Sequence, residues 1–259
     1  MLDIDARLQA AVQSYWMARK DNSSKQRELG RTDAGTRGEV TGGAQMAAFE
    51  LLLADILCDA GLTHADVRIG KRLELPGYFR GTKKWDLMVV SEGQLVLAME
   101  FKSQAGESIG KNINNRTEEA LGSAKDFWTA FREGRFGGKA STPFLGYLFL
   151  LEDGDRMHTA VSNKEPNFEV DPVFRGLPAP RKLKSKAVTR HTGVSYAARY
   201  ELLCRRLVLE RVYSASCFLM ATNSVPSVVT QPANDLSFAH FAAALRGHVL
   251  TFLDSQCRR

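Results

Sequence analysis

The sequence predicts an α/β fold in which a mixed central sheet is flanked by helices. Stretches whose apolar residues recur with the helical period alternate along the chain with short apolar runs. Two of these runs are spaced as in a β-hairpin, and another is the most continuously apolar stretch of the chain. Such alternation is typical of a layer of strands covered by helices. With 259 residues, of which 44% are hydrophobic and 25% charged, the chain is long enough to bury a sizeable core in one domain.

The first 60 residues predict two helices joined by a polar loop. Apolar side chains recur near the helical period over residues 3–20 and again over residues 45–60, where a glycine marks the end of the helix. Residues 21–43 are polar and rich in glycine, which is typical of a loop. The second helix carries Glu50 and Asp55, for which we favour a surface role over a contribution to a metal site.

The centre of the chain predicts a β-hairpin that carries charged side chains. Two apolar runs, residues 84–90 and 94–102, are separated by the turn Ser91-Glu92-Gly93. Successive side chains of a strand point to opposite faces. One face of the second run therefore carries Val96, Ala98, Glu100 and Lys102.

Asp86, at the start of the first hairpin strand, meets Glu100 and Lys102 if the pairing register allows. Carboxylate oxygens suit Mg²⁺, which keeps several of its waters. An ion so held lowers the pKa of a bound water and stabilises a leaving oxygen, while Lys102 positions or deprotonates the water. The alternative is an amphipathic strand with surface charges, but charged residues at the end of an apolar strand need a reason. We therefore favour a metal-dependent nuclease site.

The remaining pattern completes the sheet and its helices. Residues 66–75 predict a first strand that ends at a Pro-Gly turn, and residues 103–110 predict a loop. A helix then begins near Asn115 or Thr117, either of which is a suitable cap, and extends to about Arg132. The later elements are a central strand buried on both faces at 144–152, irregular chain at 153–174, a helix at 196–210, a strand at 216–221 and a last helix at 238–253.

The net charge of +6 is unevenly distributed. Nine basic residues lie between Pro178 and Arg211, against only two acidic ones. Such clustering is typical of a surface that binds a polyanion; the alternative is a solvated loop followed by a helix with a charged face. The basic residues are Arg181, Lys182, Lys184, Lys186, Arg190, Arg199, Arg205, Arg206 and Arg211.

Other compositional features narrow the class of protein. The four cysteines and five histidines are scattered, which argues against a zinc site and for reduced thiols. No apolar run approaches the length of a membrane span, and the acidic start does not resemble a signal peptide. We therefore expect a cytoplasmic protein.

Several motifs, taken together and in order, resemble the XhoI family of type II restriction endonucleases. The resemblance extends from about Trp16 to the last helix, and this collinearity is more specific than any single motif. The motifs are Thr41 to Met46, Leu75 to Arg80, Trp85-Asp86, Glu100 to Ser103, Asn112 to Ala120 and Arg199 to Arg205.

The resemblance implies a PD-(D/E)XK restriction-endonuclease-like core that cleaves double-stranded DNA with Mg²⁺. It assigns the metal-binding acids to Asp86 and Glu100 and the catalytic lysine to Lys102. It also implies a homodimer, a palindromic target that is CTCGAG in XhoI-like enzymes, a partner DNA methyltransferase, and a bacterial cytoplasmic location. The motif's proline is absent before Asp86, at a position that varies.

We expect a single endonuclease domain over residues 1–259. Its parts are a helical N-terminal part at 1–60, a catalytic core at 61–175, and a basic segment with C-terminal helices at 176–259. Relative to the family, residues 177–193 resemble a basic insertion, which leaves the exact target open. This insertion either embraces DNA through Lys182, Lys184 and Lys186 or is a tolerated surface segment.

Candidate base-contacting residues lie just after the hairpin: Asn112, Asn114, Asn115 and Arg116. Asparagine bonds adenine and arginine bonds guanine in a bidentate manner, whereas helix capping is the alternative role for these side chains.

Two further functions compete with restriction: a PD-(D/E)XK repair nuclease that recognises DNA structure, and a DNA-binding protein without catalysis.

Overall fold

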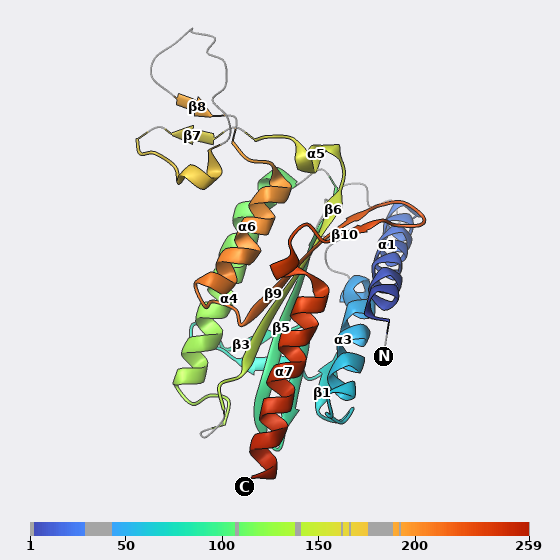
Figure 1. The fold of residues 1–259 in the computed structure, drawn as a ribbon, viewed down its shortest axis with the longest axis vertical. Helices are drawn as coiled ribbons and strands as arrows, with labels where there is room; N and C mark the ends of the chain where they lie inside the picture. Colours follow the sequence, from blue (N-terminus) through green and yellow to red (C-terminus); the bar gives the residue numbers. More distant parts are fainter. Residues whose placement is uncertain are drawn as a thin grey trace.

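The fold is built on a mixed six-stranded sheet, which confirms the predicted class (Figure 1). A computed structural model describes residues 3–28, 43–106, 109–137, 141–161, 163–165, 167–175, 189–191 and 193–258. The strand order is β1-β4-β5-β6-β9-β10. The central strands β5, β6 and β9 are parallel, and each edge is completed by antiparallel pairing. The strands are β1 Val67–Ile69, β4 Leu87–Ser91, β5 Gln94–Gln104, β6 Phe144–Asp153, β9 Ala215–Thr222 and β10 Val229–Thr230.

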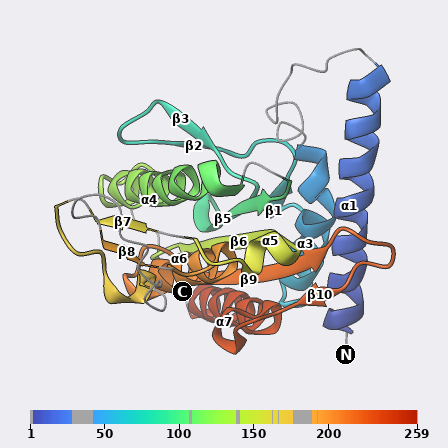
Figure 2. The ribbon, with the colours of Figure 1, turned by 90° about the horizontal axis from the view of Figure 1, so that it is seen from above.

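Helices cover both faces of this sheet. The helices α1 Ile4–Glu28, α3 Ala47–Asp59 and α7 Phe238–Cys257 contribute to one hydrophobic core. The helices α4 Ile109–Arg132 and α6 Tyr196–Leu209 contribute to a second core on the opposite face. Figure 2 shows α4 and α7 on opposite sides of the central strands. None of the helices in the described ranges is long and apolar enough to cross a membrane.

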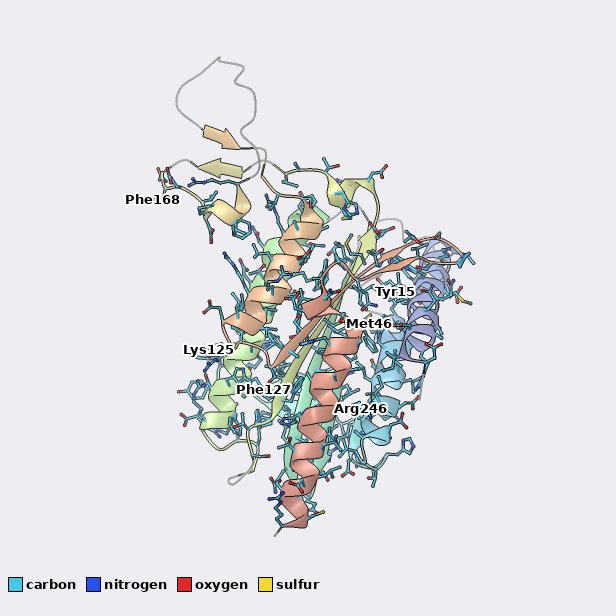
Figure 3. The ribbon with its side chains drawn as sticks, in the orientation of Figure 1. Tyr15, Met46, Lys125, Phe127, Phe168 and Arg246 are labelled. Carbon is cyan, nitrogen blue, oxygen red and sulfur yellow. The ribbon has the colours of Figure 1, made fainter. Side chains whose placement is uncertain are left out.

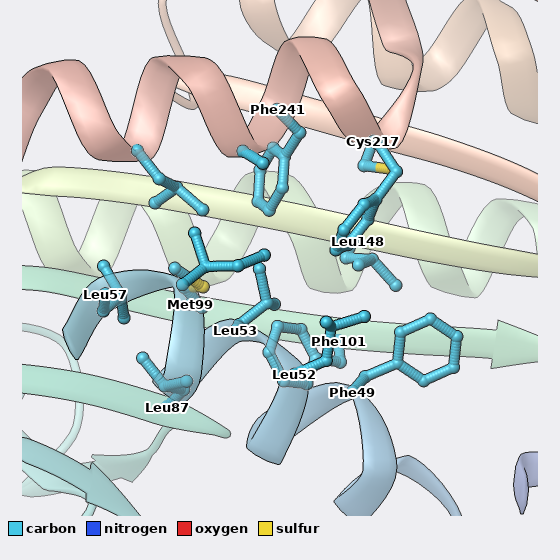
Figure 4. Packing of buried hydrophobic residues seen from close by; sticks show 14 of the residues in the cluster. Phe49, Leu52, Leu53, Leu57, Leu87, Met99, Phe101, Leu148, Cys217 and Phe241 are labelled. Atoms are coloured by element: carbon cyan, nitrogen blue, oxygen red, sulfur yellow. The ribbon is translucent and has the colours of Figure 1, made fainter. Parts of the chain in front are cut away.

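The first core lies between one face of the sheet and the helices α1, α3 and α7. Phe49 and Leu53 of α3, Met99 of β5, Leu148 of β6 and Phe241 of α7 are all fully buried and pack together (Figure 4). Full burial of each such side chain contributes about 1.5–3 kcal/mol relative to exposure. The prediction that the run at 144–152 lies centrally is confirmed, because β6 has a neighbour on each side.

Short elements connect these layers. Two antiparallel ribbons, β2 with β3 and β7 with β8, lie outside the central sheet. The short elements are the 3-10 helices η1 Gly43–Met46, η2 Pro172–Phe174 and η3 Asn234–Leu236, the helix α5 Asp155–His158, and the strands β2 Glu74–Pro76, β3 Thr82–Lys84, β7 Asn163–Glu165 and β8 Thr189–His191.

The predicted hairpin is β4 and β5, but a bulge changes the faces of Val96 and of Leu95, which packs in the second core with Ala98. Glu92 and Gly93 form the turn with φ of 50° and 75°, as a two-residue hairpin turn requires. The register shifts between Val89 and Val90, so that Val96 is the extra residue of β5. Val96 therefore packs in the core with α3 and α7, and its predicted place on the face of Glu100 is wrong.

Several element boundaries differ from prediction: residues 153–174, predicted to be irregular, contain α5, β7 and η2, and the last helix extends to Cys257. The helix α1 extends to Glu28, so the first part of the predicted loop at 21–43 is helical. The chain turns at Gly70 and Arg72, which both have positive φ, so residues 66–75 form two strands in different sheets. The helix α4 begins at Ile109, so residues 103–110 are not all loop and neither Asn115 nor Thr117 is a cap.

The apolar face of α4 explains its early start. Ile113, Ala120, Ala124 and Phe127 are buried against the sheet, and this packing outweighs the weak helix propensity of the asparagines in its first turns. Thr117 donates its hydroxyl hydrogen to the Ile113 carbonyl 2.9 Å away, as threonine does inside a helix.

The β2–β3 ribbon is fastened to α4 at its tip. The buried carboxylate of Asp126 accepts hydrogen bonds from the backbone N–H groups of Tyr78 and Phe79, at 2.8 and 2.7 Å, and pairs with Arg80 Nε at 2.9 Å. A Cβ on Gly77 would lie 2.6 Å from the Arg80 carbonyl oxygen, so the turn requires glycine there. In Figure 2 the ribbon extends over α4.

We expect Asp126→Ala to destabilise the protein by about 2–4 kcal/mol, because it leaves two backbone donors and a guanidinium group without their acceptor. Urea denaturation measures this difference. Lys125→Ala is the matched control, since Lys125 is the adjacent but exposed position on α4 (Figure 3); it should change stability by less than about 0.5 kcal/mol. Equal stability of the two variants would contradict the role of Asp126.

Candidate active site

Asp86 is fixed opposite Glu100 by the pairing of β4 with β5. Leu87 is paired with Met99, and the Asp86 N–H donates to the Met99 carbonyl at 3.0 Å. The Asp86 side chain in turn accepts a hydrogen bond from the Phe101 N–H at 2.7 Å through Oδ2. The register on which the sequence argument depended therefore brings the two carboxylates together.

Glu100 is buried and its carboxylate is bonded on both oxygens. Oε1 lies 2.9 Å from Lys102 Nζ and 3.1 Å from Lys83 Nζ. Oε2 accepts a hydrogen bond from the Tyr213 hydroxyl at 3.0 Å. The same hydroxyl lies 3.2 Å from the Ala120 carbonyl oxygen, and its single proton favours the charged acceptor. A buried carboxylate requires such compensation.

Lys102 belongs to a wider network of charges. Its ammonium group lies 4.0 Å from Glu119 Oε2, which also accepts a hydrogen bond from Arg116 Nη1 at 2.7 Å. Glu119 and Arg116 both come from α4, one turn apart. The network therefore links the end of β5 to the helix that follows it.

The pKa shifts of the three motif residues follow from burial and from their neighbours. Burial raises the pKa of Asp86, and the Phe101 hydrogen bond and Lys102 offset only part of this. Burial also acts to raise the pKa of Glu100, but Lys102 and Lys83 overcome it and hold that pKa below its usual value. For Lys102, burial acts to lower the pKa, but Glu100, Asp86 and Glu119 raise it. Lys102 is therefore a stable ammonium ion.

The donor set fits a hard divalent cation that keeps most of its waters. No hydrogen bond from the described residues reaches Asp86 Oδ1, and the described partners of Glu100 Oε1 are the ammonium groups of Lys102 and Lys83. Within the described ranges, no group of three or more His, Cys, Asp or Glu side chains could enclose a metal ion. Two carboxylates with water and substrate phosphate are the usual setting of Mg²⁺ in proteins.

Glu50 and Asp55, for which a surface role is preferred, are both partly exposed on α3, but Glu50 also interacts electrostatically with Asp86. Glu50 is half-buried on α3, and burial together with the negative charge of Asp86 raises its pKa to about 7, partly offset by Lys84. Asp55 is about half-exposed and forms an ion pair with Arg7 of α1. Helix α3 thus supplies a third carboxyl group beside the pair.

Three residues of this site are not predicted from the sequence: Lys83, Tyr213 and Glu119. Lys83 lies on β3, and its side chain is only 14% exposed. Tyr213 is more than 100 residues away from Glu100 in the chain, just before β9, and no local pattern marks it. Glu119 follows Arg116 by three positions, a spacing at which helix side chains meet, so this contact was accessible once the helix was placed correctly.

The predicted DNA-contacting residues have different environments. Asn114 and Asn115 are exposed on the first turns of α4, whereas Asn112 donates to Gln104 Oε1 at 3.1 Å. The Arg116 side chain is largely buried and bonded to Glu119. Lys182, Lys184 and Lys186 lie outside the described residues. Contact of any of these with DNA stays a prediction.

The α6 arginines of the basic cluster are paired within the protein. Arg205 bonds Asp235 through two nitrogens, at 3.0 and 3.1 Å, and Glu201 at 2.8 Å. Arg206 bonds Asp171 at 2.6 Å. These contacts connect α6 to η3 and to η2, so the paired arginines hold elements of the fold together.

The mixed sheet between helices, with paired carboxylates and a lysine on adjacent strands, defines a restriction-endonuclease-like nuclease core. Residues 25–230 match the family described as restriction endonuclease XhoI. The chain therefore belongs to the XhoI family of type II restriction endonucleases, which are site-specific deoxyribonucleases. Enzymes of this class act on double-stranded DNA and generally use a divalent metal ion.

Individual relatives support the same assignment. The chain is 44% identical over 226 residues to the type II restriction enzyme BstVI of Geobacillus stearothermophilus, covering 85% of this chain and 93% of that enzyme. It is 40% identical to AbrI of Azospirillum brasilense, over 72% and 84% of the two chains. It is 38% identical to XhoI of Xanthomonas vasicola, over 81% and 77%. No solved structure matches.

The raised pKa of Glu50 predicts a pH dependence of stability in the absence of metal. The unfolded chain loses this proton near the ordinary pKa of 4.5, but the folded protein keeps it to about pH 7. Glu50 therefore lowers stability progressively as pH rises from about 4.5 to about 7, and by a constant amount above that. Glu50→Gln should gain stability relative to wild type at pH 8 but little at pH 5.

Urea denaturation with EDTA at both pH values measures this difference. Asp55→Asn, on the same helix, is the control; it removes an ion pair with Arg7 and should show no gain at pH 8. If Glu50→Gln changes the free energy of unfolding by the same amount at pH 5 and pH 8, the pKa of Glu50 is not raised in the folded protein.

Proposed function

We propose that the protein is a Mg²⁺-dependent restriction enzyme that hydrolyses both strands of a palindromic DNA site, CTCGAG. The observation that carries the proposal is the meeting of Asp86, Glu100 and Lys102 across β4 and β5. Membership of the XhoI family supports the reaction class, and the resemblance of the motifs supports the target sequence.

In this proposal Asp86 and Glu100 hold the ion beside the scissile phosphate. When bound, Mg²⁺ activates a water and neutralises charge that develops on the phosphate and the leaving oxygen. Tyr213 keeps Glu100 oriented by its bond to Oε2. Without a metal ion, the carboxylates of Glu100, Asp86 and Glu119 raise the pKa of Lys102. This favours a role for Lys102 as a cation that orients the water and stabilises the phosphorane.

The proposed assembly is a homodimer of a single endonuclease domain. A two-fold axis that coincides with the axis of a palindrome presents one active site to each strand. Candidate DNA contacts are the exposed Asn114 and Asn115 on α4, together with Asn112, Arg116 and the lysines of the basic insertion. Function in the bacterial cytoplasm also requires a methyltransferase that protects the host's own sites.

Digestion of unmethylated plasmid and phage DNA with Mg²⁺, followed by sequencing of fragment ends, tests the target. We expect uniform ends at every CTCGAG site and no cleavage with EDTA. Uniform ends at another sequence would retain the enzyme class but refute this target. Cleavage confined to branched or mismatched DNA would indicate a repair nuclease, and binding without cleavage a DNA-binding protein.

The catalytic assignment predicts that Glu100→Gln and Lys102→Met each lower the cleavage rate by about 10³-fold or more, because each removes a group needed in the transition state. Specific DNA binding should be retained within about tenfold, since neither substitution removes a side chain proposed to contact DNA. Single-turnover cleavage and electrophoretic mobility shifts measure the two properties. Lys125→Met, far from the site on the exposed side of α4, is the control. Efficient cleavage by either site variant would refute the assignment.

A further inference from the structure

Two lysines contact the same oxygen of Glu100, although the family motif accounts for only one of them. Lys102 Nζ is 2.9 Å and Lys83 Nζ is 3.1 Å from Oε1. Oε2 is already bonded to Tyr213, whose hydroxyl lies against the buried backbone of Ala120. Oε1 is therefore the oxygen that a cation would approach.

Lys83 reaches Glu100 from outside the central sheet. It lies on β3, in the ribbon whose tip is fastened to α4 through Asp126. Its ammonium group is 4.5 Å from the centre of the Trp85 ring and 3.4 Å from the Lys84 carbonyl oxygen. Trp85 is itself buried and packs edge-on against Phe127. The ring is thus a fixed second partner for the ammonium group.

A divalent cation on Oε1 cannot share that oxygen with both ammonium groups. A Mg²⁺–oxygen contact is about 2.1 Å long, which would place like charges within a few ångströms of each other in a buried site, where solvent screens them weakly. One ammonium group must move away. Lys102 also interacts with Glu119 and Asp86, which hold it in place, whereas Lys83 has the nearby Trp85 ring to move toward.

We propose that Lys83 occupies the cation's place on Glu100 in the metal-free enzyme and is displaced toward the Trp85 ring when a divalent cation binds. Lys83 is then a positioning residue that keeps the buried carboxylate neutralised and competes with the metal. This inference rests on the proposed role of Glu100 as a metal ligand. It predicts that removing the charge of Lys83 strengthens metal binding, whereas a merely structural contact predicts the opposite.

The test is titration of the DNA-free protein with Mn²⁺, an oxygen-binding substitute for Mg²⁺, with free Mn²⁺ measured by electron paramagnetic resonance. Lys83→Met should bind Mn²⁺ roughly five- to tenfold more tightly than wild type, a little above the effect of an exposed charge pair. Lys83→Arg keeps the charge and should bind like wild type. Thermal unfolding of each variant checks that it is folded.

Two controls separate this inference from the proposed function. Lys125→Met removes a positive charge on the exposed side of α4, far from the site, and should change affinity by less than about twofold. Glu100→Gln should lose the site. If Glu100→Gln binds Mn²⁺ as wild type does, the metal assignment itself fails, and this inference with it. If Glu100→Gln loses binding but Lys83→Met binds equally or more weakly than wild type, only the competition by Lys83 is refuted.

Discussion

The buried charge of Glu100 is the constraint on which the arrangement of the site depends. A carboxylate removed from water is costly unless charged partners and hydrogen bonds compensate it. Here the compensation comes from Lys83 of β3, Lys102 of β5 and Tyr213 before β9. Two segments outside β5 must therefore reach one carboxylate, which fixes the β2–β3 ribbon and the connection between α6 and β9 against the central hairpin. The fold and the site thus share the same contacts.

The two carboxylates of the pair are in unequal environments, and this inequality is useful for binding a cation. Glu100 is surrounded by positive charge, so its pKa is lowered. Asp86 is buried with less compensation, and the nearby Glu50 has its pKa raised by Asp86. The Asp86–Glu50 side of the site is therefore deficient in positive charge when no metal is bound. A cation bound between Asp86 and Glu100 would neutralise the Asp86 carboxylate directly. At Glu100 it would have to replace the ammonium groups of Lys83 and Lys102, which already neutralise that carboxylate.

The main parts of the fold and the central motif could be predicted from the sequence because they depend on local patterns. The hairpin, the apolar strand β6 and the pair Glu100 and Lys102 on one face all follow from alternation. The bulge at Val96 could not be predicted, since it inserts one residue without any change of composition. The early start of α4 was missed because the packing of Ile113 outweighed the local preference of asparagine. Lys83 and Tyr213 could not be found, because their role exists only in the contact with Glu100.

The basic cluster shows why composition overestimates the surface available to DNA. Counterion release from DNA depends on positive charge that meets phosphates, and Arg205 and Arg206 already bond Asp235, Glu201 and Asp171. Asp235 and Asp171 lie 30 and 35 positions away from these arginines in the chain, so a local count of charges does not include them. Each pair is partly exposed and contributes little stability by itself. What the pairs provide is orientation of α6 against η2 and η3, and α6 in turn leads to Tyr213. Arg205 and Arg206 therefore act on the active site through the fold, whereas contact of the lysines of the cluster with a polyanion stays a prediction.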